Sequence, residues 1–157
     1  IANLGATIAN RGWFITPHVV KDIQDEDLDS LYTTRRYTMA SPSNYDYVVQ
    51  GMRQAVLNGT CKGANSPLYE VCGKTGTAQN PHGQDHSAFM GFAPMDNPKI
   101  AICVYVENGI WGATFGVPIG ALMIEQYLTG GLSPESEEKA KTFEERHLIQ
   151  VDNVIGK

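Results

Sequence analysis

The chain has 157 residues, of which 42% are hydrophobic, and its formal net charge at pH 7 is −5. This length fits one domain or part of a larger one, and the hydrophobic fraction is enough for a packed core. Charges of both signs are mixed along the chain, which excludes the basic surface typical of nucleic-acid binding. No apolar run approaches the roughly 18 residues that a membrane-spanning helix needs. The chain begins with Ile1 rather than Met, so we expect a fragment of a longer protein.

The first element that the sequence predicts is a helix. Leu4 and Ile8 are four residues apart among alanines, which predicts a helix over residues 1–10 that ends near Gly12. A β-like stretch is expected at residues 18–20, followed by a polar, irregular segment over residues 24–41.

A second helix is expected after residue 41. Ser43 is predicted as its N-cap, with Asp46 three residues later completing a capping box. Asn58-Gly59 is predicted to end this helix. Its buried face is expected to contain the apolar residues that recur at helical spacing, Tyr45, Val48, Val49, Met52 and Val56.

Three short apolar runs follow, at residues 69–72, 89–94 and 100–106. Short links join them, so they predict an antiparallel meander. The run at 100–106 is apolar on both faces, which predicts a central, covered strand. A last helix is expected to begin at Pro118, as its first helical residue, to end at Gly130-Gly131 and to cover one face of the sheet. The predicted fold class is therefore α+β, an antiparallel sheet flanked by helices.

The chain has three cysteines, too few for a disulfide scaffold. Cys103 lies in the most apolar strand and is expected to be a buried thiol. Cys61 and Cys72 flank one loop. The spacing leaves open whether they form a disulfide in an oxidising compartment or remain free, because spacing does not fix geometry.

Two clusters of potential ligands raise the question of a metal. Residues 25–29 contain four carboxylates, but they lack the central Gly and closing Glu of a calcium loop, so a solvated turn is expected. His82 and His86 are four residues apart, as in some zinc helices, but Pro81 and Gly83 indicate a loop. The sequence therefore predicts neither a metal nor a cofactor.

The triplet Lys74-Thr75-Gly76 is the stretch with the clearest chemistry. In a strand, Lys74 and Gly76 would share one face, and Thr75 and Thr77 the other. Lys74 offers a point charge with three donors, and Gly76 allows close approach of a ligand. The threonines offer hydroxyls suited to a carboxylate and N–H groups suited to an oxyanion. The alternative is a solvated edge strand whose lysine discourages aggregation.

Several motifs in order give the triplet a context. Lys-Thr-Gly-Thr-Ala-Gln at 74–79 is followed by Asp-His-Ser-Ala-Phe at 85–89 and Gly-Phe-Ala-Pro at 91–94. With residues 2–12 and 16–20, they resemble the C-terminal part of the transpeptidase domain of class B penicillin-binding proteins. The likeness is greatest to the elongation-type penicillin-binding protein 2 group.

The resemblance extends from about Ile1 to about Tyr127. It implies a β-lactamase/transpeptidase-like fold, of which residues 1–131 form the C-terminal portion and residues 132–157 a polar, acidic tail. It also implies that Asp85 and His86 fix the loop at the start of a strand.

The implied activity is that of a peptidoglycan D,D-transpeptidase, in which a serine attacks a D-Ala-D-Ala stem peptide and β-lactams form the same acyl-enzyme. Lys74 and Thr77 would be catalytic, and Thr75, Gly76 and Thr77 would bind substrate. The implied location is the periplasmic face of the bacterial inner membrane, with the anchor outside this chain. The implied partners are stem peptides, β-lactam antibiotics and membrane proteins of the elongation machinery, with no nucleic acid.

The nucleophile of this chemistry is expected to be missing from the chain. Ser136-Glu137-Glu138-Lys139 matches Ser-x-x-Lys, but it follows the triplet and is expected to lie in a charged, solvated segment. The sequence contains no Ser-x-Asn. We therefore expect the fragment alone to be inactive. Two alternatives remain: a non-catalytic β-lactam or wall-fragment sensor of the same fold, and a generic αβ domain with an accidental triplet.

Overall fold

The structure is a computed structural model that describes residues 1–146. Its sheet contains β3 (Cys72–Ala78), β4 (His86–Ala93) and β5 (Ile100–Val106), all antiparallel and in the order β3-β4-β5. The predicted meander is therefore confirmed. The prediction that residues 100–106 form the central strand is wrong. The two short links place β4 between its neighbours, and β5 lies at an edge of the described sheet.

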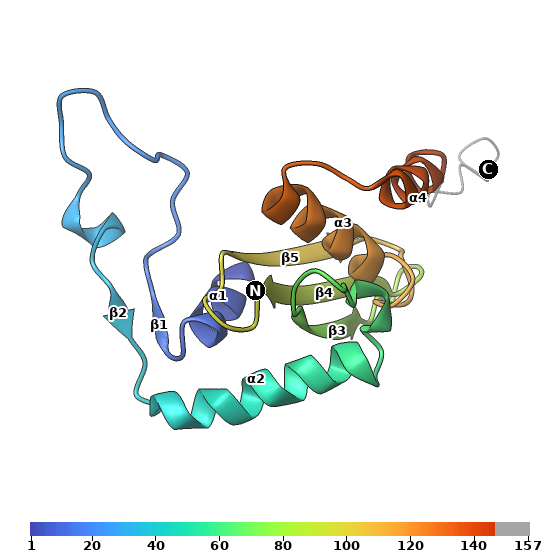
Figure 1. Ribbon diagram of the computed structural model, residues 1–157, viewed down its shortest axis with the longest axis horizontal. Helices are drawn as coiled ribbons and strands as arrows, with labels where there is room; N and C mark the ends of the chain where they lie inside the picture. The colour runs from blue at the N-terminus through green and yellow to red at the C-terminus, as the bar shows by residue number, and fades with distance from the viewer. Residues whose placement is uncertain (147–157) are drawn as a thin grey trace.

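Helices cover both faces of this sheet, as Figure 1 shows. On one face, α3 (Gly116–Thr129) packs on β4 and β5 around Phe89, Ile102 and Val104. On the other face, α1 (Ala2–Ala9) contacts β5 and β4, and a second cluster forms around Phe92. Because β5 has a helix on each face, its apolar character is explained even though it is an edge strand. These contacts confirm the predicted α+β class and the predicted role of the last helix.

The helix α2 (Pro42–Leu57) runs along β3 and contributes Val49 and Met52 to the second cluster. The prediction of Ser43 as its N-cap is wrong. The N-cap is Ser41, because Pro42 fits the first helical turn, and Asp46 instead accepts a hydrogen bond from Arg11 at 3.2 Å. The helix ends with Asn58 as its C-cap, as predicted.

The predicted buried face of α2 is only partly correct. Val49, Met52 and Val56 are buried, and Tyr45 is half-buried with its hydroxyl 2.8 Å from that of Thr38. Val48 is exposed, because it lies outside the stripe that faces β3.

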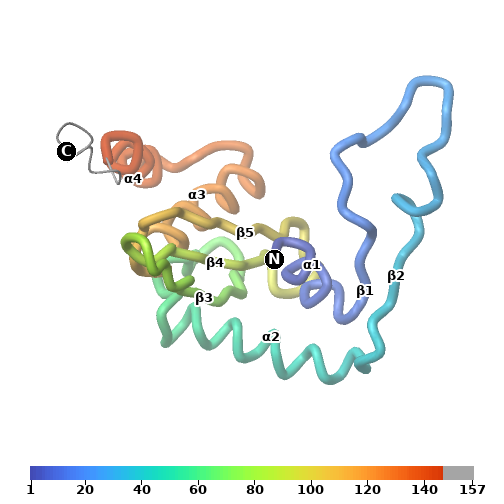
Figure 2. Tube along the Cα trace, turned by 180° about the vertical axis from the view of Figure 1, so that it is seen from behind, coloured from blue at the N-terminus to red at the C-terminus, as the bar shows by residue number. Residues whose placement is uncertain are grey.

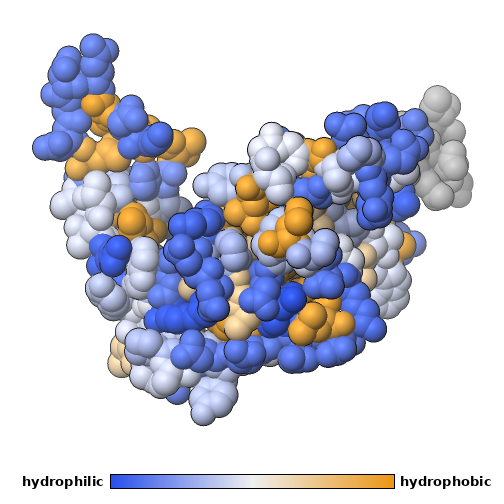
Figure 3. All heavy atoms as spheres, in the orientation of Figure 1, coloured by the Kyte–Doolittle hydropathy of each residue, from blue (hydrophilic) through white to orange (hydrophobic). Residues whose placement is uncertain are grey.

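Residues 13–40 form an arm that extends away from the sheet (Figures 1 and 2). At its base, β1 (Trp13–Phe14) pairs with β2 (Arg36–Tyr37), and the 3-10 helix η1 (Ser30–Tyr32) lies further out. The predicted strand at residues 18–20 is wrong, because within residues 1–146 no strand lies beside it to pair with its apolar residues. Figure 3 shows hydrophobic surface on this arm, and Val19 is fully exposed.

The remaining elements are η2 (Lys62–Ala64) and α4 (Pro134–Glu144). The helix α3 begins at Gly116, earlier than the predicted Pro118, because the Ser87 hydroxyl accepts a hydrogen bond from the Gly116 N–H at 3.0 Å. It ends as predicted, with Gly130 in the left-handed region at a φ of 78°. Of the predicted tail, residues 147–157 lie outside the described part. Within residues 1–146, no helix has the length and apolar character needed to cross a membrane.

Candidate active site

The Lys-Thr-Gly triplet lies in β3, which pairs only with β4 in the part of the chain that the structure describes. Lys74 stands opposite Met90, on the sheet face covered by α1, whereas Thr75 stands opposite Phe89, on the face covered by α3. The predicted alternation of Lys74 and Gly76 with the two threonines is therefore confirmed. Lys74, Gly76 and Thr77 are exposed, so a ligand along the free edge of β3 can reach both faces.

Hydrogen bonds and close packing hold Thr75 more firmly than the other residues of the triplet. Its hydroxyl lies 2.6 Å from that of Thr60, and its carbonyl accepts a hydrogen bond from Lys74 Nζ at 2.9 Å. Gly112 lies against it from the loop before α3. A Cβ at residue 112 would come within 2.6 Å of the Ala88 carbonyl oxygen, so the packing requires a glycine.

Gly76 contrasts with Gly112. A Cβ added at Gly76 would meet only the Ala88 Cβ, at 3.5 Å, which is ordinary van der Waals contact. The backbone φ of Gly76 also lies outside the left-handed region that favours glycine. The fold itself therefore does not require a glycine at this exposed position of β3.

Asp85 and His86 organise the loop before β4. An Asp85 carboxylate oxygen accepts a hydrogen bond from the Asn80 N–H at 3.1 Å, and His86 Nδ1 accepts one from the Asn108 N–H at 3.0 Å. The expectation that they fix this loop is confirmed. His82 is exposed in a turn, where its N–H donates to the Asn80 side chain at 3.0 Å.

The acidic segment also makes local contacts. Asp29 caps η1 by accepting a hydrogen bond from the Leu31 N–H at 2.8 Å. Among residues 1–146, no group of three or more His, Cys, Asp or Glu side chains is arranged to hold a metal.

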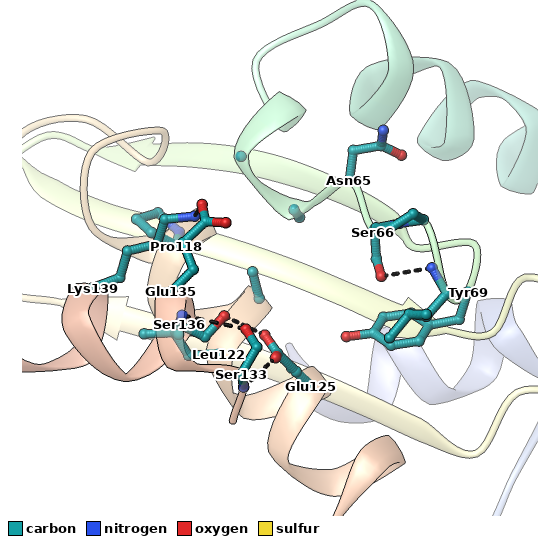
Figure 4. Close-up of a pocket in the computed structure, with 15 residues that line it drawn as sticks. Asn65, Ser66, Tyr69, Pro118, Leu122, Glu125, Ser133, Glu135, Ser136 and Lys139 are labelled. Carbon is teal, nitrogen blue, oxygen red and sulfur yellow. Dashed lines mark hydrogen bonds and ion pairs between the residues drawn. The ribbon is translucent and has the colours of Figure 1, made fainter. Parts of the chain in front are cut away.

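Figure 4 shows Ser136 and Lys139 at a cavity of about 370 Å³ between α3, α4 and residues 63–69. The Ser136 hydroxyl donates a hydrogen bond to the Glu125 carboxylate, whereas Lys139 Nζ pairs with Glu135 at 2.7 Å. Ser136 is thus held by a carboxylate of another helix, and Lys139 is not its base. The expectation that Ser136 is solvated is wrong, because docking of α4 on α3 buries it. The cavity shares no lining residue with the triplet.

The cysteines answer one open question and differ from one expectation. Cys61 and Cys72 are free thiols, and each is fully buried in a different core cluster. The structure therefore does not contain the Cys61–Cys72 disulfide, a pairing that the sequence left open. Burial raises the pKa of the Cys61 thiol, and the nearby Thr60 and Thr75 offset part of this rise. Burial also raises the pKa of Cys72, to about 11, against the opposing charges of Arg53 and Arg11. Cys103 is half-buried rather than buried, and it stands opposite Met90 on the sheet face that α1 contacts.

Two contacts of the triplet were missed by the sequence reasoning. Thr60 lies 15 residues before Thr75, and Gly112 lies in a loop with no motif of its own. Neither contact has a local pattern that could have revealed it.

Comparisons with known proteins agree with this geometry. The family model for the penicillin binding protein transpeptidase domain matches residues 1–120. Peptidoglycan D,D-transpeptidase PbpA of Mycobacterium tuberculosis is 35% identical over 143 residues, covering 82% of this chain and 28% of the relative.

Two solved structures give the same result. Pseudomonas aeruginosa PBP2, in complex with WCK 5153, has a TM-score of 0.69 and 35% identity over 85% of this chain and 30% of that one. Penicillin-binding protein A from M. tuberculosis, as a ceftriaxone acyl-enzyme complex, has a TM-score of 0.68 and 31% identity, covering 81% and 31%. The chain therefore spans less than a third of the length of these relatives. Because the family model covers most of the chain and the fold is shared, the chain belongs to the penicillin-binding protein transpeptidase family.

Proposed function

We propose that the full-length protein is a serine-type peptidoglycan D,D-transpeptidase and that β3 of this chain forms one wall of its active site. A serine outside residues 1–157 attacks the carbonyl of a D-Ala-D-Ala stem peptide, and the terminal D-Ala leaves. The amine of a second stem peptide then attacks the acyl-enzyme and completes the cross-link. A β-lactam acylates the same serine. The acyl-enzyme described for penicillin-binding protein A supports this chemistry.

Gly76 is the observation that carries the proposal. The fold leaves room for a side chain at this position, yet the residue there is a glycine on an exposed edge strand. A glycine without a packing role is explained if a ligand passes close to the backbone, where any Cβ would keep it away.

The neighbouring residues have distinct roles in this proposal. The hydroxyls of Thr75 and Thr77 bind the carboxylate of the substrate or β-lactam, and the Thr77 N–H contributes to the oxyanion hole. The Lys74 ammonium is exposed on the other face of β3 and stabilises negative charge near the nucleophile. Residues 1–131 belong to the transpeptidase domain, and residues 132–157 form an appended tail.

The setting follows from the proposed chemistry. Stem peptides lie outside the inner membrane, so we place the domain on its periplasmic face, with an anchor outside this chain. Its partners are stem peptides, β-lactams and membrane proteins of the elongation machinery.

Substitutions in β3 of the full-length protein test the proposal, with the second-order rate of acylation by a penicillin as the measurement. Gly76→Ala is expected to reduce this rate about 10- to 100-fold by displacing the ligand, without loss of thermal stability. Thr75→Val and Thr77→Val each remove a donor to a charged group and are expected to cost roughly 10- to 150-fold. Gly51→Ala is the matched control, because a Cβ there meets nothing within 4 Å. Wild-type rates in all three β3 variants would reject the proposal.

Two further assays separate the alternatives. Acylation of the full-length protein without cross-linking of stem peptides would instead indicate a sensor. The 157-residue chain alone is expected to form no penicillin adduct, because the hydrogen bond of Ser136 goes to Glu125 and Lys139 pairs with Glu135. Intact-mass spectrometry would detect an adduct on Ser136 and so contradict this part of the proposal.

A further inference from the structure

Either hydroxyl of the Thr60–Thr75 pair can be the donor, and the direction of this hydrogen bond decides which hydrogen is free. Their oxygens are 2.6 Å apart, and a single hydrogen bond joins them. Each hydroxyl has one hydrogen to donate and can also accept. If Thr75 donated to Thr60, it would have no hydrogen left for a ligand. If Thr60 donates to Thr75, the hydrogen of Thr75 remains available.

The backbone around Thr60 is fixed by the end of α2. The N–H groups of Gly59 and Cys61 both donate to the Ala55 carbonyl, at 3.1 and 3.0 Å. A Cβ at Gly59 would lie 2.9 Å from Ala55 Cα, so the turn packs tightly on the helix. Cys61 is fully buried in the core below Thr60. Thr60 is therefore presented to β3 from a fixed turn.

The Cys61 sulfur does not displace this hydrogen bond. A thiolate would be a stronger acceptor than the Thr75 hydroxyl and would compete for the Thr60 hydrogen. Burial has the largest effect on the Cys61 thiol and raises its pKa, although Thr60, Thr75 and the charge of Lys74 lie close enough to offset part of this rise. The sulfur therefore stays protonated and is a weak acceptor.

We propose that Thr60 is a positioning residue for the transpeptidase: it donates to Thr75 and so leaves the Thr75 hydrogen for the carboxylate of the substrate or β-lactam. This inference rests on the proposed function. The chain of donors runs from Thr60 to Thr75 to the carboxylate, and each bond polarises the next. Thr60 itself does not touch the ligand.

The test compares Thr60→Val, which keeps the shape, with Thr60→Ser, which keeps the hydroxyl, in the full-length protein. The measurement is the acylation rate by benzylpenicillin and by its methyl ester, which lacks the carboxylate charge. Thr60→Val is expected to lower the rate with benzylpenicillin roughly three- to tenfold, the range of one neutral hydrogen bond, because the Thr75 hydroxyl loses the bond that orients and polarises it. The ester should acylate at the rate it shows with the wild-type protein, and Thr60→Ser should restore the rate with benzylpenicillin. An equal loss with both compounds would mean a purely structural role and would overturn the inference.

A double-mutant cycle with Thr75→Val separates this inference from the proposed function. If Thr60 acts through Thr75, Thr60→Val has no further effect in the Thr75→Val background. If Thr75→Val lowers acylation and Thr60→Val does not, the inference fails and the proposed function stands. If Thr75→Val has no effect, the proposed carboxylate site at Thr75 fails, and the inference fails with it.

Discussion

Gly112 lies against Thr75 so closely that a Cβ at residue 112 would be 2.9 Å from Thr75 Cβ. The loop that leads into α3 is thus packed directly on the proposed substrate-binding strand. We expect Gly112→Ala to destabilise the protein by about 1–3 kcal/mol, because the backbone of Ala88 cannot move aside easily. Chemical denaturation measures this difference. Gly76→Ala is the matched variant and should unfold like the wild type, since its Cβ meets only Ala88 Cβ at 3.5 Å. Equal stability of the two variants would contradict this packing.

The cysteines provide a chemical test of the core. We expect three free thiols when unreduced protein is titrated under denaturing conditions. In the native protein Cys103 should react first with an alkylating agent, because Cys61 and Cys72 are fully buried. A count of one thiol would show that Cys61 and Cys72 had formed a disulfide. That result would contradict their burial in separate core clusters.

The Cys72 thiol predicts how stability depends on pH. Burial raises its pKa from 9.0 to about 11 in the folded protein. Below pH 9 the thiol is protonated in both states, and above it the unfolded chain loses the proton first. Stability should therefore fall between about pH 9 and pH 11, by about 2 kcal/mol from this group. Urea denaturation of the wild type and of Cys72→Ala at several pH values measures the contribution. If the free energy of unfolding fell with pH equally in the wild type and in Cys72→Ala, the expected contribution of Cys72 would be contradicted.

Glu125 is expected to hold the first turn of α4. Its carboxylate accepts hydrogen bonds from the Ser133 N–H and the Ser136 hydroxyl. Burial alone would raise the pKa of Glu125, but these hydrogen bonds and the charge of Lys139 lower it overall. The stabilisation is therefore present above the ordinary pKa of 4.5 and is lost as the pH falls through the lowered value.

Hydrogen exchange of the α4 amides measures this attachment. Glu125→Ala should increase exchange in the first turn. Later turns should be less affected, because the Phe143 ring stays 6.0 Å from the ring of Phe115. Glu138→Ala, at an exposed position of the same helix, is the control. If Glu125→Ala leaves exchange of the first turn unchanged, Glu125 does not hold α4.

The sequence predicted the sheet well because its signals are local. Residues 100–106 form a strand as predicted, although at an edge of the described sheet and not at its centre, and the short links allow only a meander. The errors arise where structure depends on distant residues. Val19 has strand-like neighbours in sequence, but the described part of the chain offers no strand to pair with it. Val48 fits the helical spacing but faces away from β3.

In the candidate site, too, the local features could be predicted from the sequence and the contacts between distant segments could not. The triplet and the alternation of its faces could be predicted, because a motif and the period of a strand are local properties. The Thr60 hydroxyl and the position of Gly112 could not, because both depend on how separate segments pack. The fate of Cys61 and Cys72 was likewise decided by the cluster that each one joined.

The acylation rate of Lys74 variants in the full-length protein tests the central claim most directly. Lys74 is exposed on an edge strand, so Lys74→Ala should leave thermal unfolding unchanged. It should lower the second-order rate of acylation by a penicillin on the order of 100- to 1000-fold, because it removes the charge that we propose stabilises negative charge near the nucleophile. Lys74→Arg should not restore the rate, since a planar guanidinium does not replace a compact ammonium. Acylation of Lys74→Ala at the wild-type rate would contradict the account and leave β3 as scaffold alone.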